Sequence, residues 1–224
     1  MSEFFFTRFD DADYGTYFMP TAWGYTLFAL ILIACLLIAS FMSGKKARMK
    51  AKELAYCSVA LALAYVSSTF LKLVHMPMGG SITLFSMLFI CLIGYWYGLR
   101  TGLLTAIAYG LLQLVTNPWI ISLPQMLFDY ILAFGALGLS GLFANSKKGL
   151  IKGYLAGVLG RLLFSFISGI AFFASSAAEY NMSAPLYSIA YNGAYIGGEA
   201  LLTIVVLLIP PVNKALGRIK SEAL

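Results

Sequence analysis

Residues 120–143 read IISLPQMLFDYILAFGALGLSGLF, a long apolar run whose one charged side chain is Asp129. A helix rises about 1.5 Å per residue, so about 20 such residues cross the roughly 30 Å hydrocarbon core of a bilayer. Similar runs predict six more spans, at about 19–43, 53–74, 82–98, 101–116, 150–175 and 187–210. With 61% hydrophobic and 11% charged residues among 224, the chain is predicted to be an all-α polytopic membrane protein and not a soluble domain.

The basic residues gather between particular spans. Lys45 to Lys52, the 145–152 loop and the tail after residue 213 hold most of the lysines and arginines. With seven spans, the positive-inside rule places all three on the cytoplasmic side, with the N-terminus outside and the C-terminus in the cytoplasm. The net charge of +6 therefore reflects membrane orientation, and no nucleic-acid partner is predicted.

The first basic cluster also marks a boundary. Residues 1–52 are predicted to form an extracellular N-terminal segment, an extra transmembrane helix and a basic loop. Residues 53–224 are predicted to form a six-helix membrane domain. His75 is the single histidine, the cysteines have no metal-ligand spacing, and there is no GxxxxGK[ST] phosphate loop. We therefore expect no metal, no cofactor and no use of ATP by this chain alone.

Three ionisable residues lie well inside predicted spans: Asp129, Arg161 and Glu199. A charge at the centre of a membrane helix costs at least about 2.5–3.5 kcal/mol on insertion scales, so each needs a partner or a function. Arg161 and Glu199 fall near mid-depth, which predicts a structural interhelical ion pair, with a ligand role as the alternative. Asp129 has no evident basic partner at its depth. It is predicted to be the counter-charge for a cationic or amino-bearing ligand, unless backbone or hydroxyl donors satisfy it.

Neighbouring residues favour an external cavity near Asp129. Gln125 precedes it by one helical turn, and Trp119 is predicted at the outer mouth. Two later helices carry residues at i+4 spacing, which places each set on one face: Arg161, Ser165, Gly169 and Phe173, and then Tyr187, Tyr191 and Tyr195, with Asn192 on a neighbouring face. Aromatic faces with a carboxylate suit a flat cationic ligand, although such rows also occur in lipid-facing belts and cores.

The six-helix part, from about Glu53 to the end, resembles the substrate-binding (S) subunit of energy-coupling-factor (ECF) vitamin transporters, specifically the thiamine-specific family. Three motifs carry the resemblance together: Met78-Gly-Gly-Ser81, Gln125-Met-Leu-Phe-Asp-Tyr130 with Ala133, Phe134 and Gly138 following, and Tyr187-Ser-Ile-Ala-Tyr-Asn192. The resemblance leaves the first helix unexplained.

The resemblance implies ligand-binding roles for residues that match the family pattern. They are Asp129 and Tyr130, Tyr187 and Asn192, an aromatic residue at Tyr109 and a close-approach glycine at Gly169. A carboxylate and an amide can read an aminopyrimidine edge, and aromatic faces can accept a thiazolium cation. Ser165 stands where the family commonly has histidine, and Phe173 where some members have tryptophan.

The resemblance also implies partners and a location: a membrane coupling subunit, two cytoplasmic ATPases and the bacterial plasma membrane. Ala60 and Ala64 are spaced for docking on the coupling subunit, or equally for packing inside the subunit. The expected function is uptake of thiamine from outside. The alternatives are an S subunit for a thiamine precursor, pyrimidine or related vitamin, an intramembrane enzyme using Asp129, Glu199 or Ser165, and a structural membrane subunit.

Overall fold

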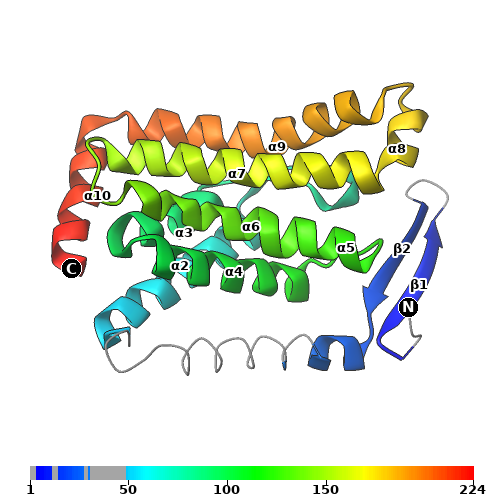
Figure 1. The fold of residues 1–224 in the computed structure, drawn as a ribbon, viewed down its shortest axis with the longest axis horizontal. Helices are drawn as coiled ribbons and strands as arrows, with labels where there is room; N and C mark the ends of the chain where they lie inside the picture. The colour runs from blue at the N-terminus through cyan, green and yellow to red at the C-terminus, as the bar shows by residue number, and fades with distance from the viewer. Residues whose placement is uncertain (1–3, 12–14, 28–29, 31–48) are drawn as a thin grey trace.

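Long apolar helices dominate the computed structural model, which describes residues 4–11, 15–27, 30 and 49–224 (Figure 1). Among these residues, five helical segments have the length and apolarity to cross a bilayer: α2 (Ala51–Phe70), α4 (Leu99–Thr116), Leu123–Phe143, α7 (Gly149–Phe172) and α9 (Ala184–Leu207). The prediction of a multi-helix membrane protein is thus supported. The predicted span at 19–43 lies mostly outside the described residues.

The segment Leu123–Phe143 is not a uniform α-helix. It begins as α5 (Leu123–Met126), passes through the π-helical turn η2 (Leu127–Leu132) and the short α6 (Ala133–Gly135), and ends as the 3-10 helix η3 (Ala136–Phe143). Single π turns inside helices occur frequently at functional sites. Here the π turn contains Asp129 and Tyr130.

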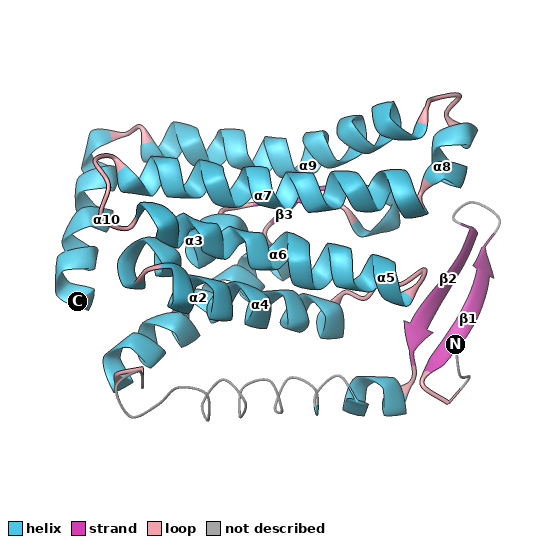
Figure 2. Cartoon of the chain, in the orientation of Figure 1, coloured by secondary structure: helices cyan, strands magenta, loops and turns pink. Residues whose placement is uncertain are grey.

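Helix α3 (Ser86–Tyr97) has 12 residues, fewer than the span predicted at 82–98. It is about 18 Å long and does not reach across a bilayer. The chain before it is extended: β3 (Lys72–His75) pairs antiparallel with β4 (Ser81–Thr83), and the 3-10 turn η1 (Pro77–Gly79) joins them. Figure 2 labels β3 among the helices of the bundle. The sequence did not predict the β3–β4 hairpin. Non-helical backbone at membrane depth must be buried in protein or line a cavity.

Glu199 of α9 satisfies the polar groups where α3 begins. Its carboxylate accepts hydrogen bonds from the Thr83 hydroxyl at 2.5 Å, the Ser86 hydroxyl at 3.0 Å and the Met87 N–H at 2.8 Å. A negative charge at a helix N-terminus is also favoured by the helix dipole. Glu199 is therefore a capping residue for α3, supplied by another helix.

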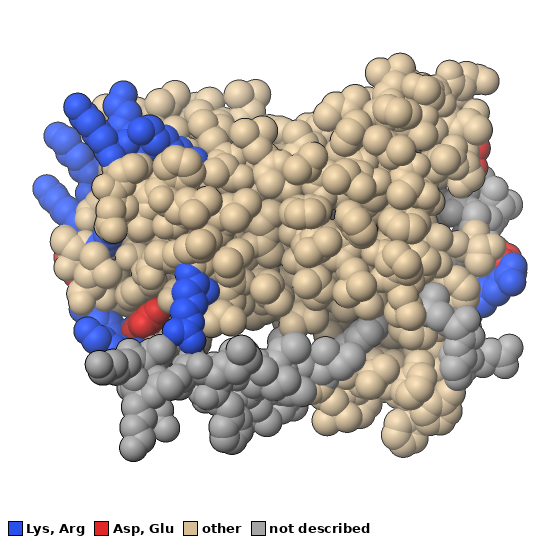
Figure 3. Space-filling view, in the orientation of Figure 1, with Lys and Arg blue, Asp and Glu red and all other residues tan. Residues whose placement is uncertain are grey.

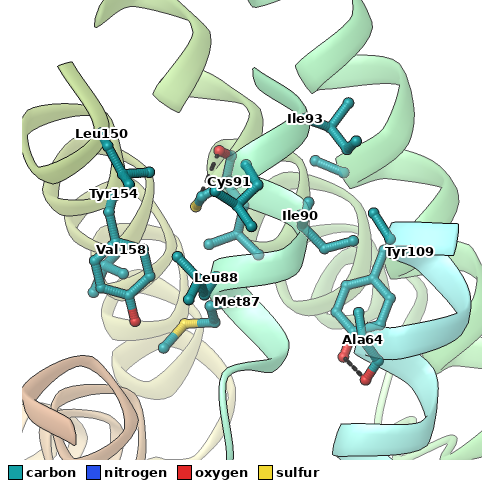
Figure 4. Close-up of a cluster of buried hydrophobic side chains, with 14 of the residues drawn as sticks. Ala64, Met87, Leu88, Ile90, Cys91, Ile93, Tyr109, Leu150, Tyr154 and Val158 are labelled. Carbon is teal, nitrogen blue, oxygen red and sulfur yellow. Dashed lines mark hydrogen bonds between the residues drawn. The ribbon is translucent and has the colours of Figure 1, made fainter. Parts of the chain in front are cut away.

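The main core lies around α3. It includes Met87, Ile90, Cys91 and Ile93 of α3, and the neighbouring helices add Ala64, Tyr109, Leu150, Tyr154 and Val158 (Figure 4). Within it the Tyr109 hydroxyl donates to the Ala64 carbonyl at 3.3 Å. Ala60 and Ala64 are 6% and 0% exposed. They pack inside the subunit, which is one of the two roles expected for this pair.

The two ends of the bundle differ in charge. Helix α10 (Pro210–Ala223) turns away from α9 at Pro210, and the Tyr97 hydroxyl donates to the Ala223 carbonyl at 3.1 Å. Most of the Lys and Arg side chains visible in Figure 3 gather at this end. The opposite end holds α5, the short helix α8 (Ala174–Glu179) and an N-terminal hairpin of β1 (Phe6–Asp11) and β2 (Gly15–Pro20). The sequence did not predict that hairpin either.

Candidate ligand-binding site

A cavity opens at the end of the bundle that holds α5 and α8. Its volume is about 940 Å³, open mouth included. Nine of the predicted ligand residues line it: Trp119, Gln125, Asp129, Tyr130, Ser165, Gly169, Phe173, Tyr187 and Asn192. They come from the loop after α4, from α5 and the π turn η2, from α7 and the residue that follows it, and from α9. The helices thus bring together side chains that are far apart in sequence.

Asp129 faces the cavity from the π turn η2. Its Oδ2 accepts a hydrogen bond from Gln125 Nε2 at 2.7 Å. In the part of the chain that the structure describes, the ion pair within 4.0 Å joins Arg8 to Asp10, so Asp129 has no cationic partner in direct contact. A half-buried carboxylate without a salt bridge is a suitable counter-charge for a cationic ligand.

The loop between α4 and α5 forms one wall of the cavity through bonds to nearby ligand candidates. Tyr130 donates its hydroxyl proton to the Asn117 carbonyl at 2.8 Å and accepts the Trp119 N–H at 2.7 Å. Gln125 accepts the Ile121 N–H at 3.0 Å and donates to the Trp119 carbonyl at 3.1 Å. These bonds fix Trp119, Gln125 and Tyr130 relative to one another.

The tyrosines of α9 form a ladder toward the mouth of the cavity. Ring centroids of Tyr187 and Tyr191 are 5.9 Å apart with an interplanar angle of 19°, and those of Tyr191 and Tyr195 are 5.6 Å apart in an edge arrangement. The Tyr191 hydroxyl donates to the Pro77 carbonyl and accepts the Gly80 N–H at 3.0 Å. The loop from Pro77 to Gly80 is therefore held over the cavity by α9.

Asn192 and Gly169 hold α7 against α9. The Asn192 side-chain nitrogen donates to the Ser165 carbonyl at 3.2 Å and to the Ser188 carbonyl at 3.0 Å, while its oxygen accepts from the Tyr195 hydroxyl at 3.0 Å. A Cβ atom on Gly169 would lie 2.1 Å from the Ser188 hydroxyl oxygen. Gly169 thus permits the close helix approach, and Asn192 already uses its polar atoms within the protein.

Arg161 and Glu199 do not form the predicted ion pair. Glu199 is 3% exposed and caps α3, as described above. Arg161 lines the cavity, and its guanidinium carbon lies 4.3 Å from the centre of the Phe134 ring and 5.9 Å from that of Tyr195. Similar depth along the helices suggested the pair, but Glu199 bonds to the start of α3, whereas Arg161 lines the cavity. The position of Arg161 agrees with the alternative expectation, a role in ligand binding.

Tyr109 is placed behind the cavity and not in it. It is 1% exposed, and its ring meets Phe134 edge to face at 5.3 Å.

Several cavity residues were not singled out from the sequence as ligand candidates: Lys72, Met78, Ser81, Gln113, Asn117, Phe134 and Ser188. Asn117 and Gln113, polar residues late in an apolar helix and its cap, carried a signal that could have identified them.

The cavity therefore presents the Asp129 carboxylate, the Arg161 guanidinium, the Lys72 side chain, amide groups and stacked aromatic rings around a space that opens at one end of the bundle. This arrangement can hold a flat polar ligand that carries a positive charge. In the described residues no cluster of three or more His, Cys, Asp or Glu side chains suits a metal ion.

Comparisons with known proteins agree on one family. The family model described as thiamine transporter protein (Thia_YuaJ) matches residues 54–217. The chain is 32% identical over 166 residues to the thiamine transporter ThiT of Bacillus subtilis (strain 168), which covers 67% of this chain and 83% of that protein. A solved structure of ThiT from Listeria monocytogenes matches with a TM-score of 0.59 and 26% identity, over 71% of this chain and 96% of the other. Residues 1–53 lie outside the matched family region.

Proposed function

Because the chain belongs to the thiamine transporter protein family, we propose that its cavity binds thiamine and that the subunit delivers the vitamin for uptake. The observation that carries this proposal is Asp129, a carboxylate without a direct cationic partner among the described residues, facing a cavity with stacked tyrosines. Thiamine consists of two flat aromatic rings joined by a methylene group: a cationic thiazolium and a pyrimidine that carries an amino group. Its chemistry matches that set of side chains.

The proposed pose follows from the positions of the polar groups. Asp129 accepts from the pyrimidine amino group, while the tyrosines of α9 and Phe173 face the thiazolium. Arg161 reaches the same space and donates to acceptor atoms of the ligand. Asn192 contributes once the ligand displaces its bond from Tyr195. Ser165 lines the cavity and offers a hydroxyl to the ligand.

Titration of the purified protein with thiamine, followed by the quenching of tryptophan fluorescence, tests the proposal. Trp119 lines the cavity, so a bound ligand changes its surroundings. Saturable quenching at micromolar thiamine is expected. Absence of any saturable change with thiamine would overturn the assignment. Saturation by a pyrimidine fragment with higher affinity than thiamine would instead favour the precursor ligand, for which Ser165 is the supporting observation.

The family consists of proteins named as transporters, and this function class replaces the intramembrane-enzyme alternative. We propose further that the chain works as the S subunit of an ECF transporter, coupled to a membrane coupling subunit and two ATPases. The absence of a phosphate loop from the sequence supports a need for separate ATPases. The coupling surface must lie elsewhere than Ala60 and Ala64, because both are buried.

The proposed topology has seven membrane passes, one of which combines the extended β4 with the short α3. Residues 1–52 form a separate N-terminal unit, and residues 53–224 form the membrane domain of a bacterial plasma membrane protein. The Lys and Arg residues at the α10 end support a cytoplasmic C-terminus, and the cavity then opens outward.

Uptake of labelled thiamine in cells that express the chain with and without coupling subunits tests the proposed role as an S subunit. Equal uptake in both would contradict dependence on an ATP-driven module.

A further inference from the structure

The N-terminal hairpin packs against the wall of the cavity. The Phe18 N–H of β2 donates to the Ile120 carbonyl at 2.7 Å, outside the β1–β2 ladder. Phe6 of β1 is 7% exposed and forms a cluster with Leu114, Ile120 and Tyr130. Ile120 is fully buried. The hairpin therefore bonds to the loop that contains Trp119. It also shares a buried cluster with Tyr130, which is a candidate ligand residue.

The hairpin is also a folded unit with its own contacts. Its strands pair from Phe6 with Pro20 to Asp11 with Gly15. Asp10 accepts hydrogen bonds from Arg8 at 3.0 Å and from the Thr16 hydroxyl at 2.6 Å. These side chains are exposed to solvent. Phe6 faces the bundle, whereas Phe9 of the same strand is 42% exposed.

Ile120 lies between two residues whose backbone N–H groups bond to ligand candidates. Its neighbour Trp119 gives its N–H to the Tyr130 hydroxyl, and its other neighbour Ile121 gives its N–H to Gln125. Gln125 in turn donates to Asp129 at 2.7 Å. Any displacement of Ile120 would therefore move donors and acceptors that place Tyr130, Gln125 and Asp129.

None of the described residues before position 49 lines the cavity, so the hairpin acts through other residues. It also precedes residue 54, where the family match begins. We propose that the N-terminal hairpin is a positioning element for the ligand site, with Phe6 and Phe18 holding Ile120 so that Trp119 and Tyr130 are preset for the ligand. This inference rests on the proposed function, because it assumes that the cavity binds thiamine.

Preset side chains bind more tightly because less conformational freedom is lost on binding. Replacing Phe6 by alanine removes the ring from the cluster without touching the cavity. We expect Phe6→Ala to weaken thiamine binding on the order of tenfold. Phe6→Leu refills most of the apolar contact and should restore affinity to within about twofold of the unmodified protein. Phe9→Ala, on the exposed side of the same strand, is the matched control and should bind normally.

The test uses the full chain in detergent, in a Trp23→Phe background, so that the remaining tryptophans are Trp96 and Trp119. Trp96 is 8% exposed in the core. Quenching by acrylamide without ligand then reports on Trp119, and a purely structural role of Phe6 would not change it. We expect stronger quenching and a lower thermal midpoint in Phe6→Ala, recovery of both in Phe6→Leu, and normal quenching and midpoint in Phe9→Ala.

Each outcome separates this inference from the proposed function. If the unmodified protein binds thiamine and Phe6→Ala matches it in affinity and quenching, the positioning role is overturned while the proposed function stands. Equal losses in Phe6→Ala and Phe9→Ala would overturn it too, because the buried contact would then not be the cause. If the unmodified protein fails to bind thiamine, the proposed function fails, and the quenching difference alone still decides whether the hairpin positions Trp119. A lowered thermal midpoint in Phe6→Ala without recovery in Phe6→Leu would indicate a role in folding and overturn positioning.

Discussion

Replacing Glu199 tests whether a carboxylate from α9 is required where α3 begins. In Glu199→Ala the hydroxyls of Thr83 and Ser86 and the N–H of Met87 lose their common acceptor. Each unsatisfied buried group costs about 1–3 kcal/mol, and removal of one partner from a buried charged cluster typically costs about 3–5 kcal/mol. We expect a loss of stability of about 3–5 kcal/mol, because relaxation and the removal of a buried charge offset part of the sum.

The assay is thermal unfolding of the purified protein without ligand. For a chain of this size about 1 kcal/mol corresponds to about 2–4 °C, so Glu199→Ala should lower the midpoint by about 6–20 °C. Glu199→Gln keeps one acceptor oxygen and should lose about 1–2 kcal/mol. Leu201→Ala, at a position of the same helix that is 65% exposed, is the control and should stay within about 0.5 kcal/mol.

A double-mutant cycle makes the assignment specific. If Thr83 and Glu199 act through one hydrogen bond, Glu199→Gln and Thr83→Val should couple by more than about 0.5 kcal/mol. A midpoint for Glu199→Ala equal to that of Leu201→Ala, or additive losses in the cycle, would refute the capping role.

Three further predictions concern the cavity. Asp129→Asn should weaken thiamine binding by about 10- to 100-fold, because a charge-assisted hydrogen bond is worth about 1.5–3 kcal/mol; unchanged affinity in the fluorescence titration would remove Asp129 from the site. Gly169→Ala should cost about 1–3 kcal/mol by forcing α7 away from α9, and the added change Ser188→Gly should recover the thermal midpoint, since a Cβ on Gly169 would meet the Ser188 hydroxyl first. Tyr191→Phe removes the hydroxyl that bonds both the Pro77 carbonyl and the Gly80 N–H, so stopped-flow measurements should show ligand dissociation faster by about 5- to 30-fold, the effect of one to two hydrogen bonds of about 1 kcal/mol each; an unchanged rate would show that these bonds do not limit release.

Hydropathy predicted most helices well and failed where the backbone is extended. The span predicted at 150–175 corresponds to α7 at Gly149–Phe172, and that at 187–210 corresponds to α9 at Ala184–Leu207. The strand residues Leu73 and Val74 are as apolar as helix residues, so an apolar run alone does not separate the β3–β4 hairpin from the end of a helix. The short α3 follows from that hairpin. It could be recognised only with tertiary structure.

The candidate site was more predictable than the packing around it. A charged side chain in a membrane span is costly unless it has a partner or a function, and this argument alone identified the region around Asp129. Helical spacing then gathered Gln125, Ser165 and Tyr187 on faces that meet in the cavity. The rule does not say which way a helix is rotated in the bundle. For this reason Tyr109 and Ala64, both at plausible spacings, face the core instead.

The carboxylates of Glu199 and Asp129 show what separates a structural charge from a ligand-binding one. In the described part of the chain Glu199 accepts from two hydroxyls and a backbone N–H and is closed off from the cavity. Asp129 accepts one hydrogen bond, from Gln125, and its remaining acceptor capacity faces the cavity. A carboxylate can accept about four hydrogen bonds, so Asp129 keeps acceptor capacity for a donor or cation that enters the cavity. Sequence locates both charges, but the supply of internal donors assigns capping to Glu199 and supports ligand recognition by Asp129.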